Sequence, residues 1–300
     1  MANQHSSASS EDRLRYLITG AAGQLGYEIV ECLGARDVAA FSHGQLDVTD
    51  RHAVTEAVLA YQPDVIVNAA AYTDVDGAES EPEAAYSVNA WGARNVALAA
   101  KQTESYVCYI STDFVFDGTK DYYNEWDHPA PLGVYGASKL AGEQETAAHA
   151  PAWSIVRTAW LCGRKGRNFA KTILSLRNSQ DTIEVVDDQR GSPSVASDIA
   201  AALVEVCARR LEGIFHVTNS GSATWCELAK AIMRAAGDDP ERIVPTKTED
   251  LRRPAKRPRS SVLDNACLRA AGLAALRPWQ EAFDELVCDL LNDTRERESK

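Results

Sequence analysis

A short apolar run that passes directly into a glycine-rich turn constrains this 300-residue chain more than any other feature. Residues 14–19 read as a buried strand, the turn carries Gly20, Gly23 and Gly26, and apolar residues at helical spacing begin at Leu25. A strand, a glycine turn and a helix in this order are typical of a dinucleotide-binding unit, where backbone amides meet a pyrophosphate at the helix N-terminus. The spacing Gly-x-x-Gly-x-x-Gly departs from the commoner Gly-x-Gly-x-x-Gly, so tight packing without a ligand is left open.

Further apolar strands alternate with helical segments, which predicts an α/β fold with a doubly wound parallel sheet. Two of these strands end in small or polar residues: residues 63–67 lead into Asn68-Ala69-Ala70-Ala71, and residues 106–110 lead into Ser111-Thr112-Asp113. Ligands bind outside this end of the strands in open parallel sheets. We therefore expect both segments at the rim of a site.

The predicted organisation has two parts and two tails. We expect a dinucleotide-binding domain over residues 14–160, with residues 182–210 returning to it. A smaller α/β lobe for the substrate is expected to comprise residues 161–181 and 211–292. The polar, Ser-rich residues 1–13 are expected to be a disordered tail, and the final residues 293–300 a frayed tail after the last helix.

Tyr135 and Lys139 are four residues apart in a run without proline, which places phenol and ammonium one turn apart on one helical face. A neighbouring cation favours the phenolate, so we expect it to lower the pKa of Tyr135 below the value of about 10 for a free tyrosine. Such a tyrosine can act as a general acid toward a carbonyl oxygen, which the hydroxyl of Thr112 would hold. The alternative is a half-buried tyrosine beside a solvated lysine.

Composition narrows the classes of function. The net charge of -12 argues against a nucleic-acid partner and gives no attraction to an anionic membrane. The seven cysteines form no Cys-x-x-Cys pair and the histidines complete no zinc-like ligand set, so we expect a reduced, cytoplasmic protein with no assigned metal. The basic run at residues 252–259 is either a solvated loop or the arginine supply for an anionic substrate.

Three further positions bear on ligands. The second strand, residues 37–41, ends at Ser42, where a protein selective for NAD usually carries an acid. This favours NADPH, with NADH left open. Asn89 is either structural or functional, and Trp160 is either part of the core or a stacking surface for a sugar or base.

In this order, the glycine turn, residues 68–71, residues 111–113, the pair Tyr135 and Lys139, and residues 157–160 resemble the extended short-chain dehydrogenase/reductases. More narrowly, the chain resembles the dTDP-4-dehydrorhamnose reductase family, from about residue 14 to residue 291. The most specific segments are Asn68-Ala69-Ala70-Ala71-Tyr72-Thr73, Ser111-Thr112-Asp113-Phe114-Val115-Phe116-Asp117-Gly118, Asn168-Phe169-Ala170-Lys171-Thr172 and Asp188-Gln189-Arg190-Gly191-Ser192-Pro193.

The resemblance implies a Rossmann fold and reduction of the C4 ketone of a dTDP-4-keto-6-deoxy sugar by NADPH or NADH, with dTDP-L-rhamnose as the family's product. It makes Tyr135 the proton donor, Lys139 its tuning and ribose-binding partner, and Thr112 the residue that positions the carbonyl. The substrate would be bound by Thr112, Asp113, Trp160, Asn168 and Arg257. The dinucleotide would be bound by Gly20, Gly23, Gln24, Leu25, Gly26, Ser42, Asp47, Val48, Ala70, Ala71, Tyr72, Thr73 and Lys139.

Departures from the family pattern leave several points open. Phe114 replaces a frequent tyrosine, and Glu28 matches an acidic position with which some members bind Mg²⁺ and form a homodimer, so metal and oligomer are unassigned. A related NDP-4-ketosugar reductase such as dihydrostreptose synthase is one alternative. The others are an epimerase or dehydratase of the same superfamily and a non-catalytic, NADP-binding regulatory subunit.

Overall fold

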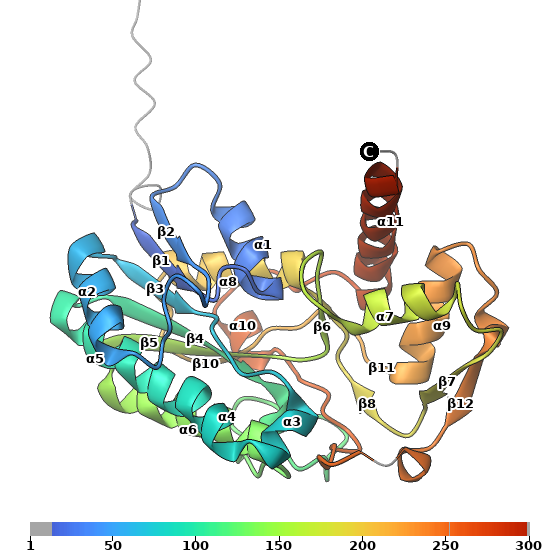
Figure 1. The fold of residues 1–300 in the computed structure, drawn as a ribbon. Coiled ribbons are helices and arrows are strands. Elements are labelled where there is room, and N and C mark those ends of the chain that lie inside the picture. The colour runs from blue at the N-terminus through green and yellow to red at the C-terminus, as the bar shows by residue number, and fades with distance from the viewer. Residues whose placement is uncertain (1–13, 252, 299–300) are drawn as a thin grey trace, which may run out of the picture.

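The computed structural model describes residues 14–251 and 253–298 and has an α/β architecture in two parts (Figure 1). The larger part is built on a six-stranded sheet whose adjacent strands all pair in parallel. In spatial order the strands are β10 (Gly213–His216), β5 (Ala152–Thr158), β4 (Tyr106–Thr112), β3 (Val65–Asn68), β1 (Tyr16–Thr19) and β2 (Val38–Phe41).

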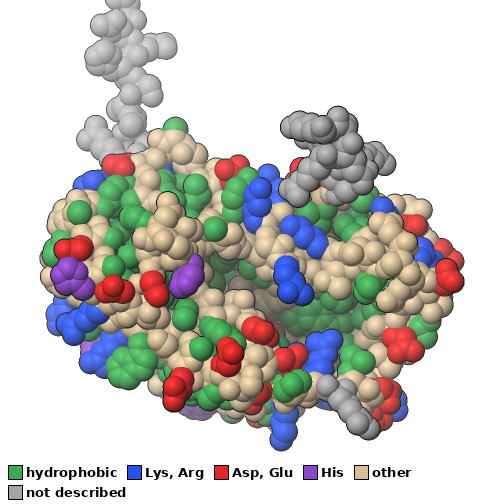
Figure 2. Space-filling view, viewed as in Figure 1, with side chains coloured by type: hydrophobic (Ala, Val, Ile, Leu, Met, Phe, Trp, Pro, Cys, Tyr) green, Lys and Arg blue, Asp and Glu red, His purple; other side chains and the backbone are tan. Residues whose placement is uncertain are grey.

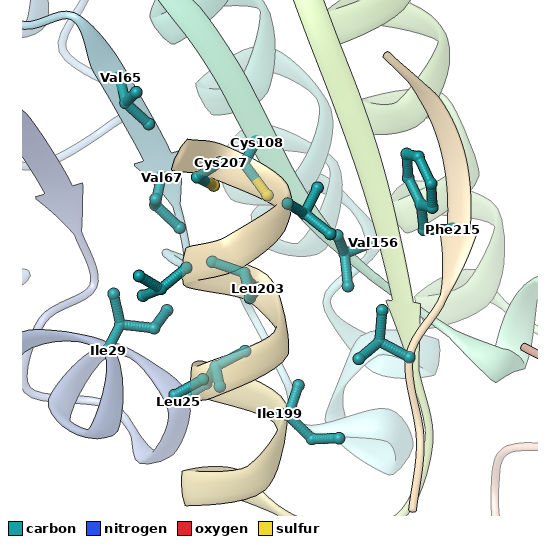
Figure 3. Packing of buried hydrophobic residues seen from close by; sticks show 14 of the residues in the cluster. Leu25, Ile29, Val65, Val67, Cys108, Val156, Ile199, Leu203, Cys207 and Phe215 are labelled. Carbon is teal, nitrogen blue, oxygen red and sulfur yellow. The ribbon is translucent and has the colours of Figure 1, made fainter. Parts of the chain in front are cut away.

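Helices cover both faces of this sheet, because its central strands are apolar on both sides. On one face, α1 and α8 bring Leu25, Ile29 and Leu203 against Val67 and Cys108 of the sheet (Figure 3). The other face is covered by α2, α5 and α6, which lie side by side (Figure 1). The bounds are α1 (Gln24–Leu33), α8 (Ala196–Ala208), α2 (Arg51–Tyr61), α5 (Ala93–Thr103) and α6 (Val134–His149).

The order of the strands positions the site. From β1 the chain moves outward to β2 and then returns to the other side of β1 to form β3 and β4. Connections leave β1 and β3 in opposite directions at this switch point, which opens a crevice at the carboxyl ends of the strands. The glycine turn after β1 and the segment Asn68–Ala71 after β3 both lie there. The predicted doubly wound sheet is confirmed.

The smaller part is assembled from short strand pairs and helices at one end of the sheet (Figure 1). The strands β7 and β12 pair in parallel, β8 and β11 pair antiparallel, and β6 and β9 pair in parallel. Its elements are β6 (Leu161–Cys162), α7 (Phe169–Leu176), β7 (Ile183–Val186), β8 (Arg190–Gly191), β9 (Ser194–Val195), β11 (Ala223–Thr224), α9 (Trp225–Ala235), η4 (Pro240–Arg242), β12 (Ile243–Thr246), η5 (Thr248–Asp250) and α11 (Trp279–Glu298).

Two expected domain boundaries differ from the structure. The strand β10 belongs to the large sheet, where it pairs with β5, and not to the smaller lobe. Residues 182–210 were expected to return to the larger domain. The strand β7 instead pairs with β12 in the smaller lobe, and of these residues only α8 packs on the large sheet. Strand pairing is decided by partners distant in the sequence, which local patterns do not encode.

The C-terminal tail expectation is also wrong over most of its length. The last helix, α11, continues to Glu298, since the charged residues after Asn292 include no glycine or proline to end it. The expected N-terminal tail, residues 1–13, lies outside the described residues, as do residues 299 and 300. Among the helices that the structure describes, none has the length and hydrophobicity that crossing a membrane requires.

The chain between β3 and β4 is helical but interrupted. It forms α3 (Val75–Ser80), α4 (Pro82–Tyr86) and the π-helical segment η2 (Ser87–Gly92) before α5. Single π turns are frequent near functional sites because they redirect a side chain. Here the π turn contains Asn89, which is fully buried.

Candidate active site

The glycine turn has the close backbone contacts that a dinucleotide site requires. Gly20 has a φ of +69°, and a Cβ there would lie 2.7 Å from the backbone of Ala69. A Cβ on Gly26 would lie 2.2 Å from the carbonyl oxygen of Gly20. No side chain caps the N-terminus of α1 at Gly23, so its first amides face the crevice uncapped. These features fit a bound pyrophosphate.

Replacing Gly26 with Ala should destabilise the protein and weaken NADPH binding, because the added methyl group meets backbone that cannot move without breaking the turn. We expect a loss of about 1–3 kcal/mol in the free energy of unfolding, the usual cost of overpacking. Gly44→Ala is the matched control, since no atom lies within 4 Å of a Cβ built there. Denaturant unfolding and NADPH titration measure both effects, and equal values for the two variants would contradict this account of the turn.

Gln24 and Asn168 meet in the structure, although the sequence assigned one to the cofactor and the other to the substrate. The Gln24 side-chain oxygen accepts hydrogen bonds from the backbone amide of Gly163 and from Asn168 Nδ2, each at 3.1 Å. Asn168 also caps α7 by accepting from the amide of Lys171. Asn168 is therefore occupied in tying the smaller lobe to the glycine turn and does not line the large cavity described below.

The remaining residues predicted to bind the dinucleotide differ in exposure. Ser42 follows β2 and is held by Gln45, whose side-chain oxygen accepts from both its amide and its hydroxyl. Asp47 is exposed and accepts from Thr49, whereas the side chain of Val48 is buried in the core. Leu25 is also a core residue, so its contribution to a ligand is limited to backbone.

Asn89 fixes the segment that follows β3. Its side-chain oxygen accepts from the amide of Tyr72 at 2.9 Å, and its nitrogen donates to the Tyr72 carbonyl at 3.1 Å. The same nitrogen donates to the hydroxyl of Ser138 in α6 at 2.9 Å. Asn89 thereby joins the predicted cofactor segment Ala70–Thr73 to the helix that carries Tyr135 and Lys139.

Thr112 and Asp113 lie at the carboxyl end of β4, where both are buried. The Thr112 hydroxyl is within hydrogen-bond distance of the Asp113 carboxylate, at 3.0 Å, and accepts from the amide of Phe114. Burial raises the pKa of Asp113 to about 6, against the opposing hydrogen bonds of Ser261 and Thr112. Tyr135, the predicted proton donor, lies close to this hydroxyl, whose hydrogen bond acts to lower the pKa of Tyr135.

The electrostatics of Tyr135 and Lys139 differ from the expectation. Burial raises the pKa of Tyr135 to about 12, and the charge of Asp113 raises it further against the lowering effect of Thr112. The expected lowering by Lys139 is therefore wrong for the protein alone. Burial also lowers the pKa of Lys139 to about 7, opposed by Glu143, while its ammonium donates to the Ile110 carbonyl at 2.6 Å and lies 4.1 Å from the centre of the Tyr109 ring.

A cavity of about 290 Å³ lies between Phe114, which follows the end of β4, and the smaller lobe. Figure 2 shows the molecule hollowed there, with hydrophobic side chains inside the hollow and Lys and Arg side chains on its rims. Phe114 lines the cavity and packs edge-on against Tyr135, with ring centres 5.6 Å apart. The predicted proton donor is thus one ring away from the cavity.

Trp160 forms one wall of this cavity together with Trp225, a residue that the sequence analysis did not single out. Their rings stack with centres 3.6 Å apart and an angle of 7° between planes. Trp160 has a φ of +46°, a conformation that costs free energy in a non-glycine residue and is common at ligand sites. Gly191 lies directly behind the indole, where a Cβ would come within 2.3 Å of it.

Arg257 lines the cavity, but its guanidinium already has a partner, whereas the predicted contact with a diphosphate would require it to be free. Its guanidinium donates to both carboxylate oxygens of Asp76, at 2.9 and 2.7 Å, and so joins the basic run to α3. Arg253 also lines the cavity and is exposed. Arg253 could not be singled out from the sequence, because several arginines and lysines lie close together in residues 252–259.

Glu28, the acidic residue that the resemblance linked to Mg²⁺, is buried and pairs with Arg164, whose Nε donates to its carboxylate at 2.9 Å. This guanidinium already supplies the positive charge that a metal would bring. Within residues 14–251 and 253–298, no group of three or more His, Cys, Asp or Glu side chains could hold a metal ion. The residues present do not fit a Mg²⁺ site.

Comparison with known proteins agrees with this geometry. The chain is 44% identical to dTDP-4-dehydrorhamnose reductase of Streptomyces griseus, over 91% of this chain and 93% of that protein. It is 39% identical to dTDP-4-keto-6-deoxy-D-glucose reductase of Streptomyces niveus, over 90% of this chain and 96% of that protein. The crystal structure of dTDP-4-dehydrorhamnose reductase from Bacillus anthracis in complex with NADP superimposes with a TM-score of 0.89 at 39% identity, covering 92% of this chain and 99% of that one.

The family described as RmlD substrate binding domain matches residues 14–292, which include both the sheet and the smaller lobe. The match therefore covers the glycine turn, the end of β4 and the cavity together. The chain belongs to the RmlD substrate binding domain family.

Proposed function

We propose that this protein reduces the C4 ketone of a dTDP-linked 4-keto-6-deoxy sugar with NADPH, with dTDP-4-dehydro-L-rhamnose as the substrate and dTDP-L-rhamnose as the product. One observation carries the proposal: α6, which bears Tyr135 and Lys139, contacts the end of β4, which bears Thr112, through the Lys139 ammonium on the Ile110 carbonyl and the Tyr135 ring on Phe114. The names of the relatives from Streptomyces griseus and Streptomyces niveus support a dTDP-linked ketosugar.

Bound NADPH supplies the hydride, and the residues of the chain handle the proton and the geometry. We assign Tyr135 as the proton donor to the carbonyl oxygen. Because its pKa is raised to about 12, its phenol stays protonated until the reaction begins. The Thr112 hydroxyl would hold the same oxygen, and Lys139 would bind the nicotinamide ribose. The low intrinsic acidity of Tyr135 makes the charge of Lys139 important, because a cation stabilises the phenolate that forms.

The cavity suits a nucleoside diphosphate. The stacked Trp160 and Trp225 offer an aromatic surface to a base or sugar, and Arg253 offers a cation to the diphosphate. Arg257 would contribute by exchanging Asp76 for phosphate or by holding the basic loop in place.

NADPH is the proposed cofactor for two reasons. Position 42 is a serine and not the acidic residue that would bind the ribose hydroxyls of NADH, and the similar Bacillus anthracis structure contains NADP. We place the reaction in the cytoplasm, in keeping with seven cysteines that are all free thiols.

The test is to mix the purified protein with dTDP-4-keto-6-deoxy-L-lyxo-hexulose and either NADPH or NADH, and to follow the absorbance of the reduced nicotinamide. We expect loss of absorbance, faster with NADPH, and dTDP-L-rhamnose as the product. Undiminished absorbance with this substrate and with a panel of other dTDP-4-ketosugars, while NADPH still binds, would overturn the proposal in favour of a non-catalytic role.

A further inference from the structure

A buried ion pair lies beneath the catalytic residues and takes no part in the proposed chemistry. Arg157 of β5 donates from Nε and Nη2 to the two carboxylate oxygens of Glu143 in α6, at 2.8 and 2.6 Å. The side chains are 2% and 4% exposed. The hydroxyl of Ser111 in β4 donates to the same carboxylate. Three elements of the large domain therefore meet at one acid.

This acid is placed between two of the proposed catalytic groups. Glu143 follows Lys139 by four residues, which is one turn of the same helix face. Ser111 directly precedes Thr112, and the strand register pairs Ser111 with Arg157. Through these contacts the carboxylate connects α6, which carries Lys139, to the strand end that carries Thr112.

A buried ion pair needs a reason, because well-packed apolar residues of similar volume are often equally stable or more stable. Lys139 supplies one. It is only 2% exposed, and the hydrogen-bond acceptor of its ammonium is the uncharged carbonyl of Ile110. Burial lowers the pKa of Lys139 to about 7, and the charge of Glu143 opposes that shift.

Apart from Asp113, the other titratable groups near this acid carry no charge at neutral pH. Tyr109 of β4 lies against Lys139 and near Glu143, and Tyr135 of α6 lies near Tyr109. Both are neutral phenols, since burial raises the pKa of both. His216 of β10 pairs in register with Arg157, and burial together with the Arg157 charge lowers its pKa to about 3, so it is uncharged at neutral pH. Asp113 faces Tyr135 from the end of β4.

We propose that Glu143 is a positioning residue, whose carboxylate Arg157 and Ser111 hold in place so that it supports the ammonium of Lys139 one helical turn away and joins this helix to the strand end bearing Thr112. The inference rests on the proposed function for its effect on turnover. The effect of Glu143 on cofactor binding is independent of the proposed reaction, because NADPH affinity is measured without any sugar.

Glu143→Gln tests the proposal through pH dependence. Without the acid, Lys139 loses its proton at lower pH, so the pH at which NADPH affinity weakens should fall by about one unit. At neutral pH, kcat should fall about tenfold, with a smaller change in KM. Glu143→Asp should restore part of both. Glu145→Gln is the matched control, since Glu145 lies on the same helix and pairs with Arg94 and His149 near the surface.

Because Glu143→Gln leaves Arg157 without its carboxylate, the double variant Glu143→Gln/Arg157→Met is measured in parallel. It removes both buried charges, so it should fold and still show the displaced pH dependence. A folded single or double variant with the wild-type pH dependence would overturn the proposal, because the pair would then serve stability alone. If the wild-type protein reduces no ketosugar, the proposed function fails, and the NADPH titrations still decide the role of Glu143.

Discussion

Tyr135→Phe should lower kcat about a thousandfold, within the range expected when a general acid is removed, and leave NADPH affinity within about twofold of wild type. The variant loses only the phenolic oxygen, so the ring keeps its edge-on contact with Phe114. Turnover at saturating NADPH and ketosugar measures kcat, and a separate titration with NADPH measures the affinity. Loss of rate without loss of binding is the signature of a group that acts in the chemical step.

Tyr122→Phe provides the control for this substitution. Tyr122 is 59% exposed and lies outside the site, so removal of its hydroxyl should change neither quantity. A Tyr135→Phe protein that keeps more than a tenth of the wild-type kcat would show that another group donates the proton. Asp113 would then be the first candidate, because its raised pKa of about 6 leaves part of it protonated near neutral pH.

Lys139→Met should lower kcat by at least a hundredfold and weaken NADPH binding about tenfold at pH 6, by removal of a charge-assisted hydrogen bond to the ribose. Methionine has a similar length and is apolar, so it suits a position that is 2% exposed. Lys101→Met, at an exposed lysine of α5, is the matched control. Equal effects of the two substitutions would contradict the assigned role.

The pH dependence of the wild-type protein follows from the same residue. The pKa of Lys139 is lowered to about 7, so its ammonium is present below that pH and is lost as the pH rises through it. NADPH affinity should therefore weaken above about pH 7 in the wild-type protein and change little with pH in Lys139→Met. A wild-type affinity that stays constant from pH 6 to pH 9 would show that the charge of Lys139 does not hold the cofactor.

The features that could be predicted from the sequence are those encoded by neighbouring residues. The glycine turn follows its strand directly, and Tyr135 and Lys139 share one helix face, so spacing alone places them. Thr112 ends an apolar strand, which placed it at the rim of a parallel sheet. Glu143 also lies four residues after Lys139 on the same helix face, but it was not predicted, because an acidic residue on a helix is usually solvated.

The features that could not be predicted depend on partners far apart in the chain. Arg257 pairs with Asp76 and Trp160 stacks on Trp225, and nothing local to these residues indicates either contact. Asn168 contacts Gln24 because the loop after β6 folds back onto the glycine turn. The pKa of Tyr135 was misjudged for a related reason: proximity to a cation was visible in the sequence, whereas the larger effect of burial was not.

The most direct test of the proposed reaction uses NADPH carrying deuterium at both C4 positions of the nicotinamide, with dTDP-4-keto-6-deoxy-L-lyxo-hexulose as the acceptor. Mass spectrometry and proton NMR of the product locate the label. We expect one deuterium per product molecule, bound at C4 of the sugar, and about a thousandth as much labelled product when Tyr135→Phe replaces the wild-type protein over the same time. A product without deuterium at C4, or a sugar recovered unchanged while NADPH remains bound, would contradict hydride transfer at this site.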